Sequence, residues 1–393
     1  MKKFLIFIIF VLLLVGIYYY FNKDKKEEIV MNTEIRSVFI SYIDYSSKIL
    51  NKNTSQKKDN IDIMIKNIYD FGLNTIILQV RPFADAIYKS DIFKPSKTVV
   101  KNEDIELDLD ILSYFISEAH KKDIKVYAWI NPYRIRTSKD TSDISKSSIF
   151  YSWLEDSNNI EISETGIYFN PASNEVLELI LEGVKEIVLN YDVDGILYDD
   201  YFYPNKSIDE DNYNKYKATG GELTIEEYRV FNINTLIESS YKAIKSIKKD
   251  VIFGISPAGN IENNLNNEYL DIKSILNEDE YLDFVIPQLY YGFLNEAKPY
   301  IETLKIWNNM ILSNTKLVVG LSIYKSGLED TFAGIGSEEW INSEDIIKKQ
   351  VIVSRNESKY DGFAVFRYDH LFNNNLNNEN LIKEQENLLD LLR

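Results

Sequence analysis

The feature that most constrains the fold is a regular alternation of short β-rich runs with amphipathic helical runs from residue 34 onward. We expect strands at 36–41, 75–80, 125–130, 195–198, 252–255, 284–287, 317–321 and 362–366. We expect helices at 61–71, 109–122, 175–190, 225–248, 297–312, 343–355 and 379–392. Eight such repeats over about 360 residues predict an α/β fold of the (β/α)8 TIM-barrel type. A doubly wound sheet is the alternative, but no glycine-rich phosphate turn follows the first strand.

Four long connections follow predicted strands and should extend the face of the barrel at which the strands end. They cover 81–106, 131–170, 199–222 and 322–342. Barrels of this type carry their active sites on that face. No linker or second domain is apparent, so residues 34–393 are predicted to form one domain.

Polar or aromatic residues, joined after the fifth strand by a glycine, follow every predicted strand. They are Ser41, Tyr42 and Asp44 after the first strand, Gln79, Arg81 and Asp85 after the second, Trp129, Asn131, Tyr133 and Arg134 after the third, Asp199, Asp200, Tyr201 and Tyr203 after the fourth, Ser256 and Gly259 after the fifth, Gln288, Tyr290 and Tyr291 after the sixth, Ser322 and Tyr324 after the seventh, and Arg367, Tyr368, Asp369 and His370 after the eighth. Because the ends of parallel barrel strands meet at one pole, the sequence predicts a deep polar pocket there.

The adjacent acids Asp199 and Asp200 form the most informative pair at this pole. Alternation along the strand places Tyr198 and Asp200 on one side and Asp199 on the other. Two neighbouring carboxylates repel, which raises one pKa and leaves the other group ionised, as an acid/base pair requires. The alternative is a loop cap with two solvated aspartates.

Glycoside cleavage commonly uses two carboxyl groups, and the sequence leaves two schemes open. In the first, Asp85, Asp369 or Asp44 is the second carboxylate. In the second, the 2-acetamido group of the substrate is the nucleophile, one acid of the pair protonates the leaving oxygen, and the other orients the acetamide. Tyr290 would then bind the acetamide carbonyl. We favour Asp200 as the acid.

Three arginines and several aromatic residues complete the predicted pocket. Arg81, Arg134 and Arg367 could bind a carboxylate, or pair with the acids of the protein itself. The candidate sugar-stacking rings are Trp129, Tyr133, Tyr201, Tyr203 and Tyr291, each of which could instead pack the pocket wall.

The composition excludes several other chemistries. The chain has no cysteine and only two histidines, which argues against disulfides, a thiol nucleophile, a zinc hydrolase and a Ser-His triad. The net charge of −17 argues against binding to nucleic acid. Asp209, Asp211 and Asn212 resemble a calcium loop, but the required glycine and distal glutamate are missing. We therefore predict no metal and no cofactor.

The N-terminus predicts a single membrane anchor. Lys2 and Lys3 precede the uncharged run 4–21, which as a helix would span roughly 27 Å. Bulky aromatic residues occupy the position where a cleavable signal peptide has small ones, so we expect residues 1–21 to be an uncleaved signal-anchor. Residues 22–33 would form a tether, and the remainder would lie outside the cytoplasm on the cell-wall side.

At the strand-end residues the chain resembles the glycosyl-hydrolase-like family 10 proteins of bacterial cell surfaces. The resemblance extends from about residue 34 to 372. It rests on EIRSVFISYID, GLNTIILQVRPFADAIYKSDIFKPS, VYAWINPYRI, YFNPASNEV, NYDVDGILYDDYFYP, FGISPAGN, DFVIPQLYYGF and GFAVFRYD. One departure is the stretch 258–260, where relatives often carry bulkier residues.

The resemblance implies a TIM-barrel glycoside hydrolase that cuts peptidoglycan glycan strands, at least those without stem peptides. The functional residues implied or predicted are Asp199, Asp200 and Tyr290 for catalysis, and Arg81, Asp85, Asn131, Tyr133, Arg134, Asn170, Tyr201, Gln288, Arg367 and Asp369 for substrate binding. The alternatives are a non-catalytic glycan-binding barrel and a hydrolase of another exported polysaccharide. The sequence does not determine the oligomeric state.

Overall fold

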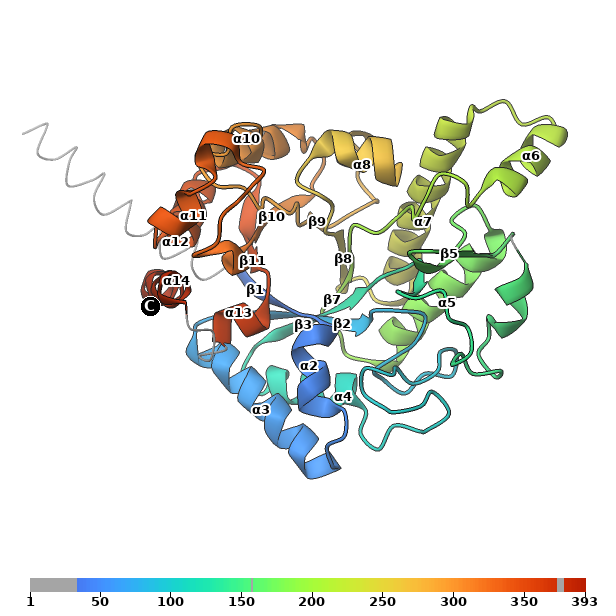
Figure 1. Ribbon diagram of the computed structural model, residues 1–393, viewed down its shortest axis with the longest axis horizontal. Coiled ribbons are helices and arrows are strands. Elements are labelled where there is room, and N and C mark those ends of the chain that lie inside the picture. The colour runs from blue at the N-terminus through green and yellow to red at the C-terminus, as the bar shows by residue number, and fades with distance from the viewer. Residues whose placement is uncertain (1–33, 157, 373–377) are drawn as a thin grey trace, which may run out of the picture. The chain divides into compact units, whose positions relative to one another are not determined.

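The computed structural model describes residues 34–156, 158–372 and 378–393. Within them, eight parallel strands close a barrel in the order β1-β11-β10-β9-β8-β7-β3-β2. Their bounds are β1 Ile35–Ile40, β2 Thr75–Arg81, β3 Lys125–Ile130, β7 Gly195–Tyr198, β8 Ile252–Ile255, β9 Phe284–Val285, β10 Lys316–Leu321 and β11 Tyr360–Val365. Figure 1 looks into the ring of strands, with helices around it. All eight predicted strands and the barrel class are confirmed.

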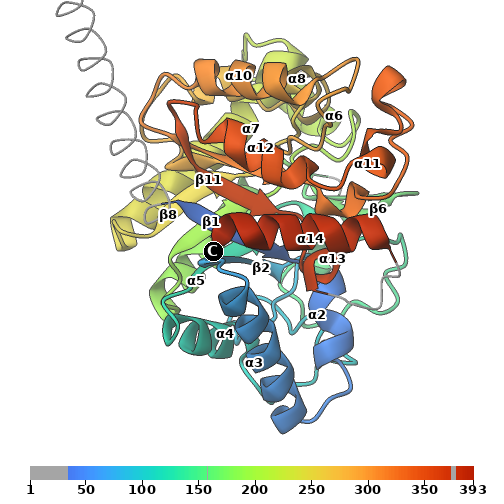
Figure 2. The ribbon, with the colours of Figure 1, turned by 90° about the vertical axis from the view of Figure 1, so that its left-hand side faces the viewer.

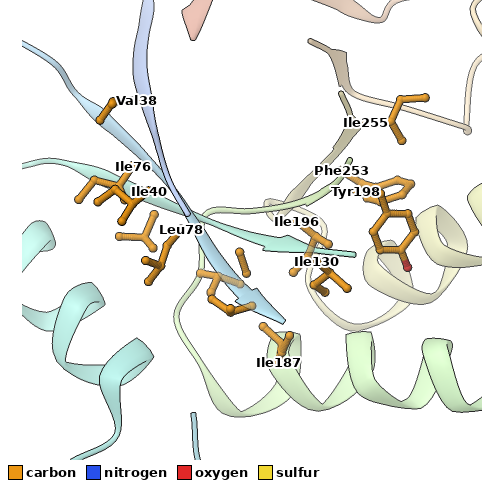
Figure 3. Close-up of a cluster of buried hydrophobic side chains, with 14 of the residues drawn as sticks. Val38, Ile40, Ile76, Leu78, Ile130, Ile187, Ile196, Tyr198, Phe253 and Ile255 are labelled. Carbon is orange, nitrogen blue, oxygen red and sulfur yellow. The ribbon is translucent and has the colours of Figure 1, made fainter. Parts of the chain in front are cut away.

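The barrel forms because alternate strand residues are apolar on their outer side. Figure 3 shows Val38 and Ile40 of β1 with Ile76 and Leu78 of β2, and Ile187 of helix α5 beneath the strands. All five side chains are fully buried. A fully buried aliphatic side chain contributes roughly 1.5–3 kcal/mol relative to an exposed one. This outer layer therefore fixes which strand residues face the barrel interior.

The helices lie outside the strands. Their bounds are α2 Tyr42–Ile49, α3 Thr54–Asp70, α4 Ile111–His120, α5 Asn174–Asn190, α6 Glu210–Ala218, α7 Ile225–Ile247, α8 Ile261–Glu268, α9 Ile272–Ile275, α10 Tyr300–Met310, α11 Glu339–Asn342, α12 Ile346–Ser354, α13 Tyr368–Phe372 and α14 Glu379–Leu392. The final helix, α14, packs beside α12 (Figure 2), where Glu384 accepts the N–H groups of Ile346 at 2.6 Å and Ile347 at 3.0 Å. All seven predicted helices are present; α3 begins at Thr54, well before the predicted residue 61, and the other ends lie close to the predicted ones.

The long connections contain structure that the sequence patterns did not predict. After β3 the chain forms a three-stranded sheet of β4 Arg134–Arg136, β5 Ile160–Ser163 and β6 Gly166–Phe169, in the order β4-β6-β5. Helix α6 lies in the connection after β7, and α8 follows β8. Such pieces are too short and too polar to show a clear hydrophobic period, so tertiary contacts decide their conformation.

The prediction of a single-pass membrane protein is corrected. In the residues that the structure describes, no helix is long and apolar enough to cross a membrane. The predicted anchor, residues 1–21, and the tether, residues 22–33, lie outside the described residues.

Candidate active site

A cavity of about 360 Å³ opens at the end of the barrel where the strands finish. Six of the predicted site residues line it: Arg134, Asp199, Asp200, Tyr201, Gln288 and Tyr290. They follow three strands of the barrel wall, β3, β7 and β9, so the closed ring of strands is what brings them together.

Asp199 faces the interior of the barrel, as the alternation along β7 predicts. Its Oδ2 accepts hydrogen bonds from Trp129 Nε1 at 3.1 Å and from Asn131 Nδ2 at 3.2 Å. Its neighbour Tyr198 points outward, and its hydroxyl lies 2.8 Å from Ser240 Oγ of α7. Asn131 therefore contributes to the site by holding Asp199, although it does not line the cavity.

Asp200 also lines the cavity, which simple alternation does not predict. The strand ends at Tyr198, so the turn that follows is free to direct both carboxylates to the same space. The Asp200 side chain is less buried than that of Asp199, which is only 3% exposed. The amide of Gln288 faces Asp200 and is itself fixed by donating to the carbonyl of Ser256 at 3.1 Å.

Burial and mutual repulsion govern the protonation of the pair. Burial, followed by the charge of Asp200, raises the pKa of Asp199 to about 7, against the opposing effects of Arg134 and of the Trp129 and Tyr201 N–H groups. Burial also raises the pKa of Asp200, against its own backbone amide, Gln288 and Arg134. Because the charge of Asp200 disfavours ionisation of Asp199, the two carboxyl groups titrate as a coupled pair.

Replacing Asp199 by asparagine should stabilise the fold at alkaline pH. Because the folded-state pKa of Asp199 lies above its unfolded value of 3.8, stability present at pH 4 is lost as the pH rises through about 7. At pH 8 the variant should gain about 2–4 kcal/mol in the free energy of unfolding, and at pH 4 almost nothing. Thermal and urea unfolding at both pH values measure this. The exposed control Asp250→Asn should show no such pH-dependent gain, and an equal gain in both variants would contradict the explanation.

Aromatic rings form a large part of the cavity wall. Phe39 packs edge-on against Trp129 at a ring-centroid distance of 5.3 Å and against Phe366 at 5.6 Å. Tyr290 packs against Tyr324 at 6.0 Å. Burial raises the pKa of the Tyr290 hydroxyl well above 10, so it stays protonated and can act as a hydrogen-bond donor. Such walls suit the apolar faces of sugar rings and the methyl group of an acetamide.

Arg134 is held rigidly at the edge of the cavity. Its Nε and Nη2 donate to the carbonyl of Pro82 at 3.4 and 3.3 Å. Its guanidinium also stacks between the rings of Phe83 and Tyr201, at 5.1 and 4.9 Å. It makes no ion pair with any described residue, and it is the only basic residue among the described residues that line this cavity. The Nη1–Nη2 edge therefore remains available to a ligand.

Three predicted binding residues lie beneath the loops instead of in the cavity. A register shift between Gln79 and Arg81 pairs Arg81 with Ile130, so its side chain points outward and stacks on Phe93 at 3.6 Å. A Cβ at Gly183 of α5 would lie 2.4 Å from Arg81 Nη1, so this packing requires the glycine. The other two residues, Asp85 and Tyr133, are buried outside the cavity at 1% and 2% exposure.

The remaining predicted residues also serve local structure. Asn170 donates to the carbonyl of Asn158 at 3.0 Å and accepts the N–H of Ala172 at 2.9 Å, which joins β6 to the start of α5. Arg367 pairs with Asp44, whose Oδ2 accepts the Ser41 N–H at 2.7 Å. Asp369 pairs with Lys48 at 2.9 Å. As a result, none of the proposed partner acids Asp44, Asp85 and Asp369 lines the cavity, where Asp199 and Asp200 are the only described carboxylates.

Several cavity residues were not among the predicted site residues. Phe39 and Ile43 line the cavity, and alternation along β1 could have indicated Phe39, whereas Gln79 and Tyr324 also line it and are predicted at this pole from the sequence. Glu268, at the end of α8, accepts the N–H groups of Phe202 and Tyr203 in the segment that follows the acid pair. No sequence pattern links α8 to that segment.

The comparisons with known proteins show the family of this chain. A family model described as Glycosyl hydrolase-like 10 matches residues 34–332, which confirms the resemblance predicted from the motifs. Glycosyl hydrolase YngK of Bacillus subtilis is 27% identical over 366 residues, covering 87% of this chain and 70% of that protein. Glycosyl hydrolase DigH of Escherichia coli K12 is 29% identical over 357 residues, covering 83% of this chain and 80% of that protein. These relatives confirm the predicted enzyme class.

Two solved structures have the same fold at low sequence identity. The glycoside hydrolase domain of PgaB (BpsB) from Bordetella bronchiseptica superposes with a TM-score of 0.55 at 12% identity, covering 91% of this chain and 99% of that one. The catalytic domain of a β-amylase from Paenibacillus polymyxa gives 0.54 at 10% identity, covering 92% and 100%. Both likenesses concern the barrel alone.

Proposed function

This chain belongs to the glycosyl hydrolase-like 10 family and is a glycoside hydrolase, and we propose that it cleaves β-linked N-acetylhexosamine glycans, specifically the glycan strands of peptidoglycan. The observation that carries the proposal is the Asp199–Asp200 pair in an aromatic cavity that contains no other described carboxylate. We propose residues 34–393 as the catalytic domain.

The missing third carboxylate favours the 2-acetamido group of the substrate as the nucleophile. A retaining glycosidase without that group needs a carboxylate nucleophile opposite its acid. Here Asp199 is fixed by Trp129 and Asn131, in a position suited to accept the acetamide N–H. That hydrogen bond would stabilise ionised Asp199 and favour the proton on Asp200. Substrate binding would thus leave Asp200 protonated and able to act as the acid.

The proposed reaction balances with these groups alone. The acetamide carbonyl oxygen attacks the anomeric carbon, the glycosidic C–O bond breaks, and the leaving oxygen takes the proton of Asp200. Asp199 stabilises the developing positive charge on the acetamide nitrogen, and Tyr290 donates to the carbonyl oxygen to orient it. Water then attacks the anomeric carbon from the face that the leaving group occupied, opposite the acetamide oxygen, and gives its proton to Asp200. This breaks the bond between the anomeric carbon and the acetamide oxygen, which opens the oxazolinium ring and restores the acetamide.

Arg134 supports peptidoglycan over a neutral glycan. The chain carries a net charge of −17 and the cavity holds two acids, so an anionic sugar needs a local cation. The free edge of Arg134 could bind a carboxylate through two parallel hydrogen bonds. In peptidoglycan strands without stem peptides, the lactyl ether of the muramic residue provides such a carboxylate.

The test compares three substrates with the wild type and with Arg134→Gln. The substrates are peptidoglycan strands without stem peptides, the same strands with the lactyl carboxylates converted to amides, and chito-oligosaccharides. Mass spectrometry of the products locates the cut. We expect Arg134→Gln to lower kcat/KM on the carboxylate substrate by roughly 10- to 100-fold relative to the other two. The ratio between substrates is decisive, because a changed pKa of the acid pair would affect all three equally.

Other outcomes would contradict parts of the proposal. An equal loss on all three substrates would show that Arg134 acts only on the acid pair, and would remove its support for peptidoglycan. Binding without products from the wild type would favour the non-catalytic glycan-binding barrel. Products from another exported polysaccharide alone would favour the third function considered from the sequence.

A further inference from the structure

Glu268 connects a separate helix to the segment that carries the acid pair. It is the last residue of α8, and its Oε2 accepts the backbone N–H groups of Phe202 at 3.0 Å and Tyr203 at 2.9 Å. These amides lie two and three residues after Asp200. Phe202 is fully buried, so the two hydrogen bonds fix the start of the segment from inside the fold.

The position of Glu268 is costly for the fold. The C-terminal end of a helix carries partial negative charge, which disfavours a carboxylate there. Burial, opposed by the two backbone hydrogen bonds and assisted by the charge of Asp200, raises the pKa of Glu268 to about 7. A glutamine could accept hydrogen bonds from the same amides without this cost. The negative charge therefore needs an explanation beyond holding the segment.

We propose that Glu268 is a positioning residue for the acid pair: its carboxylate fixes the segment after Asp200 and adds a negative charge that keeps a proton on the pair. This role rests on the proposed function of that pair. Two ionised groups near one another each make the other harder to ionise. Glu268 would thus extend the pH range over which the pair can act as an acid.

The other charged or titratable groups around Glu268 do not neutralise its charge, so its electrostatic interaction with the acid pair persists. Asp200 and Tyr201 interact with it electrostatically from the segment after β7. Arg229 of α7 lies nearby and donates to the Tyr269 hydroxyl at 2.8 Å, but its charge is paired with Asp209 at 2.8 Å. Lys206 lies over the ring of Tyr269, 5.9 Å from its centroid. Glu268 makes no ion pair with a described residue.

The test separates the charge of Glu268 from its hydrogen bonds. Glu268→Gln keeps an acceptor and removes the charge, whereas Glu268→Ala removes both. Glu262→Gln, on the exposed side of the same helix and paired with Lys298 at 2.8 Å, is the matched control. In Glu268→Gln we expect kcat at the optimum within several-fold of the wild type. The basic limb of the pH profile should move to lower pH by about half a unit or more. Glu268→Ala should show the same shift and lose at least about 10-fold in kcat.

A second measurement remains valid if no substrate is turned over. The carboxyl carbons of Asp199 and Asp200 can be titrated by 13C NMR in the wild type, Glu268→Gln and Glu262→Gln. A lower apparent pKa of the pair in Glu268→Gln alone supports the inference. An unchanged titration and pH profile would overturn it and leave the proposed function intact. Absence of turnover by the wild type would instead overturn the proposed function, while the titration still decides the role of Glu268.

Discussion

Replacing Asp200 by asparagine is expected to lower kcat for glycan hydrolysis by about 10³-fold, because the variant cannot give a proton to the leaving oxygen. The loss should depend on the leaving group. The acidic phenol of an aryl N-acetylglucosaminide leaves without protonation, so Asp200→Asn should recover the first, bond-breaking step on that substrate, while hydrolysis of the cyclised intermediate still lacks its base. Asp199→Asn should lose activity to a similar extent on both substrates, since the acetamide is left without its orienting carboxylate. Steady-state kinetics with the two substrates measure the difference.

The pattern of rescue assigns the roles of the two acids. If the aryl substrate rescued Asp199→Asn instead of Asp200→Asn, Asp199 would be the acid and Asp200 the carboxylate that orients the acetamide. Full activity in both variants would contradict the assignment of the site. Asp192→Asn is a suitable control, because Asp192 precedes the same strand at its other end and its side chain is 84% exposed. It should behave like the wild type on both substrates.

Replacing Tyr290 by phenylalanine is expected to lower kcat/KM on acetamido substrates by about 10²-fold. The Tyr290 hydroxyl makes no hydrogen bond with the described residues, and its raised pKa keeps it a donor across the working pH range. Loss of a single donor aimed at a reacting oxygen typically has an effect of this size. The ring remains, so packing against Tyr324 and Phe366 should be preserved. Kinetics and thermal unfolding of the variant measure both.

The neighbouring tyrosine provides the control for this prediction. Tyr291→Phe removes a hydroxyl one residue away that does not line the cavity, and it should leave kcat/KM within a few-fold of the wild type. A stable thiazoline analogue of the cyclised acetamide should bind the wild type more tightly than Tyr290→Phe. Equal affinity for the two proteins would argue that Tyr290 does not contact the acetamide.

The barrel could be predicted from the sequence because its determinants are local. Each strand is a short run of alternating or continuous apolar residues, and each helix presents an apolar stripe at the helical period. The ends of β2 and β3 agree with the predicted ends to within one residue. The short elements α6 and α8 and the sheet β4-β6-β5 were missed, because their residues carry no such period and are ordered by contacts with distant segments.

The site was predicted less completely than the barrel. The motif that ends β7 indicated Asp199 and Asp200, and the ends of β3 and β9 indicated Arg134, Gln288 and Tyr290, all of which line the cavity. Asp85, Asn170 and Asp369, which lie further along the connections, were predicted to bind substrate, but they do not line the cavity. A side chain a few residues beyond a strand can turn in any direction, so nearness in sequence to a strand end does not imply nearness to the cavity.

The sequence by itself determined the class of fold and predicted that Asp199 and Asp200 lie at the pole where the strands end, since strand periodicity and closure of a parallel barrel leave little freedom in those features. Only the tertiary structure decided which groups surround the acids. The register shift in β2 turns the Arg81 side chain away from the cavity. Asp44 and Asp369 form ion pairs with Arg367 and Lys48 outside the cavity. The packing of α8 brings Glu268 to the segment after Asp200. These outcomes depend on contacts between residues that are far apart in the chain, which no local pattern encodes.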